Sequence, residues 1–137
     1  MEAQATADRA GRAGRKVRAL EFIDACAAGV EPRLLGTGPI PATRKLLQRA
    51  SIGIDAIDAI EFNEAFAAQV LASMRELEIP LHKLNRRGGA LAIGHPYGAS
   101  GAVLVTRLLH QLETGQTGLA TIGIGGGIGL SALFRAV

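Results

Sequence analysis

The stretch LAIGHPYGASGAVLV, residues 91–105, places a histidine-proline pair between glycines and directly ahead of an apolar run. A second glycine cluster, TIGIGGGIGL, occupies residues 121–130. Glycine has no Cβ, so its backbone N–H groups can come close to a ligand oxygen, as in an oxyanion hole. Pro96 fixes the following backbone and favours an extended conformation for His95. If the two clusters meet in space, they frame one small reactive pocket; if they do not, they are only turns.

The apolar run after the histidine predicts a helix over residues 99–112 that lacks a polar face. Its apolar positions go nearly all the way round a helical wheel: Ala99, Ala102, Val103, Leu104, Val105, Leu108, Leu109 and Leu112. Such a helix is expected to be buried on every side. A single sheet layer in a chain of 137 residues leaves the outer face of each helix open. We therefore expect a second domain or another subunit to cover it.

Turn residues divide the rest of the chain into alternating strands and helices. Strands are predicted over residues 17–30, 57–62, 81–85, 119–124 and 130–137, and helices over residues 39–50, 64–77 and 99–112. Pro39 and Pro41 suit the entry to the first of these helices, where a missing N–H costs nothing. The order βαβαβαββ predicts an α/β fold: a mostly parallel five-stranded sheet with helices on both faces and a last strand that turns back.

Composition limits the chain to one aliphatic-cored domain, because 48% of its residues are hydrophobic and only 4% are aromatic. The net charge of +3 comes from the N-terminal segment. Residues 1–18 hold five basic groups against two acidic ones, and the remaining 10 basic groups balance 10 acidic ones. We divide the chain into a basic N-terminal helix or linker, residues 1–16, and a domain over residues 17–137.

The basic N-terminal segment raises two alternatives, a nucleic-acid-binding arm and a transit peptide. Neither is favoured: the segment lacks aromatic residues for base stacking, and Glu2 and Asp8 are unusual in a transit peptide. No apolar run reaches the roughly 18 residues that cross a membrane, and no signal peptide is found. We expect no nucleic-acid partner, no membrane partner and a cytoplasmic protein.

Several residues that often carry chemistry are interpreted as structural. Cys26 is the one cysteine, so there is no disulfide and no thiolate cluster for a metal, and we expect a buried thiol. His82 and His110 lack the glycine setting of His95. The segment GIGLSA, residues 127–132, matches a dinucleotide-binding pattern, but the five residues that follow leave no room for the required helix.

The segment EFNEAFAAQ, residues 61–69, is predicted at a strand-to-helix junction. Asn63 has two interpretations here. It could cap the following helix, with Glu64 in its first turn. Alternatively, it points from the carboxyl end of a parallel strand into the crevice where open α/β sheets bind ligands.

Together these segments resemble the carboxyl-terminal domain of thiolases, the acetyl-CoA acetyltransferase and 3-ketoacyl-CoA thiolase family. The resemblance is carried, in the family's order, by AGVEPRLLGTGPIPATRK (residues 28–45), EFNEAFAAQ (61–69), GGALAIGHPYGASGA (88–102) and GLATIGIGGGIG (118–129). It implies acyl transfer to or from CoA, with a coenzyme A thioester as substrate and no bound cofactor. It also implies assembly with a thiolase amino-terminal half or as a homo-oligomer.

The resemblance further implies roles for individual residues. His95 would activate a nucleophilic cysteine and help hold the thioester oxygen. Asn63 would hold a water that completes this first oxyanion hole, and the Gly125 N–H would contribute to a second. Tyr97 is expected to narrow the acyl site.

Two departures from the family pattern bear on activity. Gly123 stands where the family has the cysteine that shuttles a proton, and the half that carries the nucleophilic cysteine is not in this sequence. Two hypotheses follow. The chain is part of a thiolase whose acyl transfer needs the amino-terminal half, or it is a non-catalytic thiolase-like subunit that binds a partner.

Overall fold

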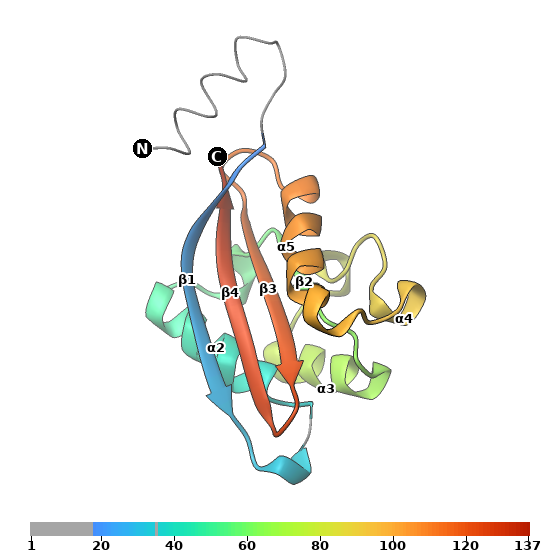
Figure 1. Cartoon of the computed structure of the whole chain (residues 1–137). Helices are drawn as coiled ribbons and strands as arrows, with labels where there is room; N and C mark the ends of the chain where they lie inside the picture. The colour runs from blue at the N-terminus through green and yellow to red at the C-terminus, as the bar shows by residue number, and fades with distance from the viewer. Residues whose placement is uncertain (1–17, 35) are drawn as a thin grey trace.

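The computed structural model describes residues 18–34 and 36–137, which build a four-stranded mixed sheet with helices on both faces (Figure 1). The strands are β1 (Leu20–Gly29), β2 (Ala59–Phe62), β3 (Thr117–Ile124) and β4 (Ile128–Ala136), in the spatial order β1-β4-β3-β2. Strand β4 pairs antiparallel with β1 and β3, while β2 and β3 are parallel.

The α-helices are α2 (Pro39–Ala50), α3 (Ala67–Leu77), the single turn α4 (Ala90–Ile93) and α5 (Ser100–Gln111). Short 3₁₀ turns lie at Pro32–Leu34, Ile54–Ala56, Leu81–Lys83 and Tyr97–Ala99. Helix α2 begins with proline, as its sequence predicts, and ends at Ser51, whose left-handed backbone turns its N–H back to the carbonyls of Leu47 and Gln48.

The sheet separates two apolar cores, because successive strand residues point to opposite faces. Leu119 and Leu133 belong to the core that packs under α2 and α3. Ala120 and Ala136 lie an odd number of positions from these leucines, so they face the other side, where they pack against Leu104, Leu108 and Leu112 of the α5 segment. The prediction of an α/β fold with helices on both faces is confirmed.

The prediction of a fifth strand over residues 81–85 is wrong, because this segment forms a 3₁₀ turn and then meets β2 at one point. Leu84 makes a single parallel bridge to Ile60. Beyond it the side chain of Asn85 takes the place of a strand: its Oδ1 accepts from the Phe62 N–H at 2.8 Å, and its Nδ2 donates to the Phe62 carbonyl at 2.9 Å. The edge of β2 is therefore satisfied at Ile60 by one backbone bond, from the Asn85 N–H at 2.8 Å, and at Phe62 by an amide side chain.

The prediction of a mostly parallel sheet is also wrong. Among the described residues only β2 and β3 run in parallel. The last strand does turn back, through residues 125–127, and inserts between β3 and β1. Both of its pairings are consequently antiparallel.

Helix α5 is not buried on every side within this chain. Ser100, Leu104 and Leu108 form its buried face, whereas Ala102 and Thr106 are exposed. The expected cover from another domain or subunit stays a prediction.

The predicted N-terminal helix, and with it the separate segment 1–16, lies outside the described residues. Within the described residues no helix has the length and apolar character to cross a membrane. The same part of the chain contains no cluster of three or more potential metal-binding His, Cys, Asp or Glu side chains.

Candidate active site

Asn63 lies directly after β2, at the carboxyl end of the parallel pair. Its side chain is 2% exposed, and its backbone N–H donates to the Thr121 carbonyl of β3 at 2.9 Å. Helix α3 begins only at Ala67, so Asn63 does not cap it. The capping interpretation is therefore wrong, and the interpretation that places Asn63 in the crevice stays a prediction.

His95 lies between two polar partners on different elements. Asn63 Nδ2 is 3.3 Å from His95 Nε2, and the Ser100 hydroxyl at the start of α5 is 2.6 Å from Nδ1. Because an amide nitrogen can only donate, Nε2 is the acceptor and Nδ1 carries the hydrogen, which it donates to Ser100 Oγ. The neutral imidazole therefore keeps its Nε2 lone pair on the side of Asn63.

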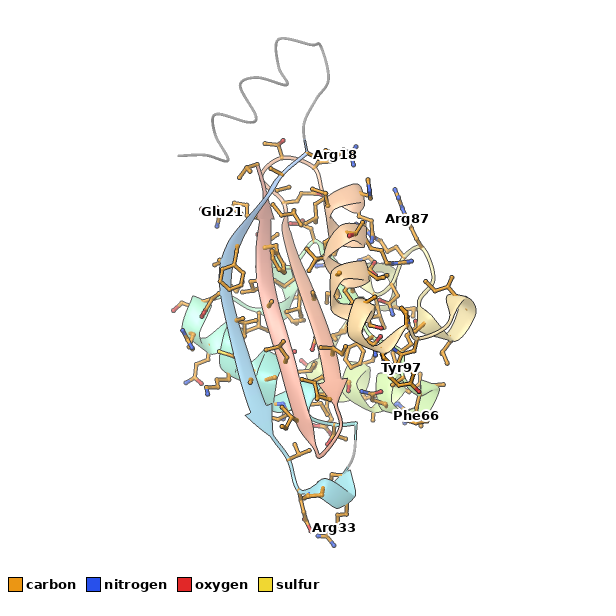
Figure 2. The ribbon with its side chains drawn as sticks, viewed as in Figure 1. Arg18, Glu21, Arg33, Phe66, Arg87 and Tyr97 are labelled. Atoms are coloured by element: carbon orange, nitrogen blue, oxygen red, sulfur yellow. The ribbon has the colours of Figure 1, made fainter. Side chains whose placement is uncertain are left out.

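The two glycine clusters meet at one open cavity of about 430 Å³. His95 and Tyr97 line it from the first cluster, and Gly123 and Gly125 line it from the second. The Tyr97 ring stacks on the imidazole with centroids 4.9 Å apart, while its own side chain is 83% exposed. Figure 2 shows Tyr97 and Phe66 at the same end of the molecule, and both line this cavity. The clusters are walls of one pocket rather than separate turns.

Gln69 of α3 packs against Gly123 in the wall of the cavity. A Cβ built on Gly123 would lie 2.6 Å from Gln69 Nε2. Gln69 is 7% exposed, and its Oε1 is buried without a hydrogen-bond partner among the described residues. Its carboxamide therefore occupies the volume that any side chain at position 123 would need.

Gly125 follows the end of β3 and faces the same cavity. A Cβ there would meet no atom within 4 Å. Within the described part of the chain its N–H has no backbone acceptor. A free N–H at a pocket wall is what an oxyanion hole requires.

Glu64 was predicted only as a residue of the first turn of the following helix, and the structure shows a different role for it. Its carboxylate accepts a hydrogen bond from Asn85 Nδ2 at 2.7 Å and another from the Leu91 N–H at 3.0 Å. Glu64 is therefore not in the first turn of α3; it holds the loop that leads to His95. A Cβ on Gly89 would overlap this carboxylate, so a larger residue there would push Glu64 away from its two partners.

Ser100 was missed as a partner of His95, although the five-residue spacing within GHPYGAS was visible in the sequence. Cys26 is 3% exposed beneath α2, which confirms the expected buried thiol. His82 and His110 are exposed and do not line the cavity.

The chain matches the family model described as the thiolase C-terminal domain over residues 16–136. It therefore belongs to the thiolase family and corresponds to the C-terminal domain of its members. A putative acetyl-CoA C-acetyltransferase VraB of Staphylococcus epidermidis is 55% identical over 116 residues, which cover 85% of this chain and 30% of that protein.

Solved thiolase structures agree with this assignment. Peroxisomal 3-ketoacyl-CoA thiolase of Saccharomyces cerevisiae, described as five-layered and built from two core domains of identical topology, matches with a TM-score of 0.84 and 42% identity, over 86% of this chain and 34% of that one. Acat5 thiolase of Ascaris suum, solved with coenzyme A, matches with a TM-score of 0.85 and 36% identity, over 94% and 34%. The chain spans about a third of the length of these relatives.

Proposed function

We propose that this chain is the part of a thiolase-type acyltransferase that supplies the base and both oxyanion holes for acyl transfer to or from coenzyme A. The observation that carries the proposal is the cavity that His95, Gly123 and Gly125 line together, with Asn63 Nδ2 3.3 Å from His95 Nε2. A pocket that places one oriented base and the free N–H of Gly125 on the same walls suits the attack of a thiol on a thioester.

In this proposal His95 Nε2 exchanges the hydrogen bond that it accepts from Asn63 Nδ2 for the proton of a cysteine thiol of the amino-terminal half. The resulting thiolate attacks the thioester carbonyl, a new carbon–sulfur bond forms, and coenzyme A leaves as its thiolate. His95, once protonated at Nε2, and a water that Asn63 holds stabilise the oxygen that becomes negative in this step. The hydrogen bond from Nδ1 to Ser100 keeps the tautomer that accepts at Nε2.

The Gly125 N–H is assigned to the second oxyanion hole, for the thioester that loses a proton at carbon. That step lacks an acid or base at Gly123, since glycine cannot move a proton. We therefore propose that acylation is retained and that carbon–carbon bond formation is impaired.

A second candidate function is that of a non-catalytic thiolase-like subunit. It is favoured by one observation: the Gln69 carboxamide fills the space where a side chain at position 123 would lie. A pocket wall closed in this way suits binding without a proton shuttle.

The partner of this chain in the proposal is an amino-terminal half of the same topology. On one face of the sheet, helix α5 covers strands β2 and β3. On the same face, which is turned towards the viewer in Figure 1, no helix of the described residues covers β1 and β4. The α5-side residues of these two strands are apolar and mostly accessible: Phe22, Ala25, Ala27, Leu130, Ala132 and Phe134. We call this set, together with α5, the open face. A second core domain placed on it would complete the layering described for the yeast enzyme.

The test joins this chain to a thiolase amino-terminal half that brings the nucleophilic cysteine. Incubation with acetyl-CoA should form an acetyl-enzyme detectable by mass spectrometry, and His95→Ala should abolish it. His110→Ala, an exposed histidine away from the cavity, is the matched control and should leave acetylation unchanged. Acetylation that persists without His95 would contradict the assignment of the base.

A further inference from the structure

Strand β2 carries a buried charge two residues before Asn63. The Glu61 side chain is 1% exposed, and its Oε2 accepts from Arg107 Nε of α5 at 2.7 Å. The Arg107 side chain is itself only 18% exposed. This ion pair joins the strand that Asn63 follows to the helix that begins with Ser100, the residue that is hydrogen-bonded to the imidazole.

Arg107 also contacts a third segment. Its second guanidinium nitrogen donates to the Gly88 carbonyl, at the start of the loop that leads to His95. The other oxygen of Glu61 accepts from Gln111 Nε2, one turn further along α5. One arginine thus bonds to β2 and to the loop from a position on α5, and these are the three segments that supply Asn63, His95 and Ser100.

We propose that Arg107 is a positioning residue for the His95–Asn63 pair, acting through Glu61 and the Gly88 carbonyl. The inference rests on the proposed function, because that function is what makes the position of His95 matter. The contacts of Arg107 themselves do not depend on it. Arg107 acts through other residues and reaches none of the reacting groups directly. The planar guanidinium suits the task because it can donate in two fixed directions at once, whereas an ammonium is a point charge.

The competing explanation is that Arg107 is only a counter-ion for Glu61. Removing one member of a buried ion pair leaves an uncompensated charge and destabilises the fold, whatever else the pair does. Removing both charges avoids that penalty. The double variant Glu61→Gln/Arg107→Met therefore keeps the charge balance of β2 and α5 but loses the donor to Gly88, which separates the two explanations.

The experiment compares this double variant with the unchanged chain and with Arg44→Met. Arg44 also pairs with a glutamate, Glu76, but both side chains are more than half exposed and lie away from the loop. Two measurements are made: the imidazole ¹⁵N chemical shifts of His95, which report the tautomer, and amide hydrogen exchange at residues 92–94. Neither depends on catalysis, so the outcome is separate from success or failure of the acyl-transfer proposal.

We expect the double variant to keep its circular dichroism spectrum while His95 loses the signature of a single Nδ1–H tautomer. Exchange at residues 92–94 should be faster by on the order of tenfold, the factor expected for one lost charge-assisted hydrogen bond. Arg44→Met should match the unchanged chain. Wild-type shifts and exchange in the double variant would show that Arg107 is a counter-ion only. If the double variant unfolds, the same two measurements are made on Arg107→Lys, which keeps the charge but lacks the planar guanidinium. The same changes in His95 shifts and in exchange at residues 92–94 are expected there.

Discussion

Gly123 and Gln69 compete for the same small volume beside His95. The Gln69 amide nitrogen lies 2.6 Å from the place of a Cβ on Gly123, yet it is the far end of a flexible side chain. A side chain at position 123 is consequently accommodated when Gln69 moves aside, because no backbone atom stands closer than the Gly36 carbonyl at 3.7 Å. The wall of the pocket is adjustable at this one residue.

Gly123→Cys in the assembly with an amino-terminal half should raise acetyl-CoA condensation by on the order of 10²-fold or more, because it supplies one positioned acid/base. Condensation is measured as the rate of acetoacetyl-CoA formation. Gly123→Ala displaces Gln69 in the same way but brings no thiol, so it should give no gain. If the Gly123 form already condenses acetyl-CoA as fast as the Cys variant, another group supplies the proton.

At the scale of elements, α2 packs on β4 through two glycines. A Cβ on Gly129 of β4 would overlap the backbone of Gly38, and a Cβ on Gly38 would overlap Gly129 in turn. Backbone atoms cannot turn aside as a side chain can. The close approach of helix and strand therefore depends on both positions.

Gly129→Ala should lower the free energy of unfolding by about 1–3 kcal/mol, the usual cost of overpacking. Gly101→Ala is the matched change in α5, where an added Cβ meets no atom within 4 Å. It should raise the free energy of unfolding by up to about 1 kcal/mol, because alanine favours a helix more than glycine does. Urea unfolding of both variants checks the opposite signs, and equal effects would argue against the packing explanation.

At the scale of the whole molecule, the open face leaves apolar groups accessible on α5, β1 and β4. Phe22 is 60% exposed and Leu130 39% exposed, and they lie on the same side of the sheet as α5. Exposed apolar surface of this kind favours association. The separate chain should therefore associate with itself when no other domain covers it.

Sedimentation velocity should show oligomers of the separate chain, and Phe22→Lys should shift them towards the monomer by placing a charge on the open face. Leu81→Lys is the control, since Leu81 is 73% exposed in a 3₁₀ turn that belongs to neither strand of that face. A stable monomer that binds no dye for apolar surfaces would refute the prediction.

The separate chain should also show no thiolysis of acetoacetyl-CoA and form no acyl-enzyme. Its one cysteine, Cys26, is 3% exposed in the core under α2, where a substrate cannot reach the sulfur. Mass spectrometry of the chain after incubation with acetyl-CoA checks this, and an acetyl group on Cys26 would overturn it.

The sequence alone was sufficient for features that depend on near neighbours. Prolines at 39 and 41 mark the start of α2, the glycines at 125–127 mark the turn between β3 and β4, and both agree with the structure. His95 and Asn63 were also proposed as site residues from their immediate surroundings, and their roles stay predictions. Such signals are readable because caps, turns and periodicity act over a few residues.

Tertiary structure alone decided what depends on distant partners. Asn85 replaces a fifth strand through bonds to Phe62, 23 positions away, and Arg107 reaches Glu61 across 46 positions. The backbone hydrogen-bonding groups at the edge of a strand can be paired with a side chain or with another strand. Periodicity cannot distinguish the two cases, because both give the same apolar pattern in the sequence. The same limit applies to α5: its sequence predicts that it needs cover, but only the arrangement of the layers shows which side is already buried and which is open.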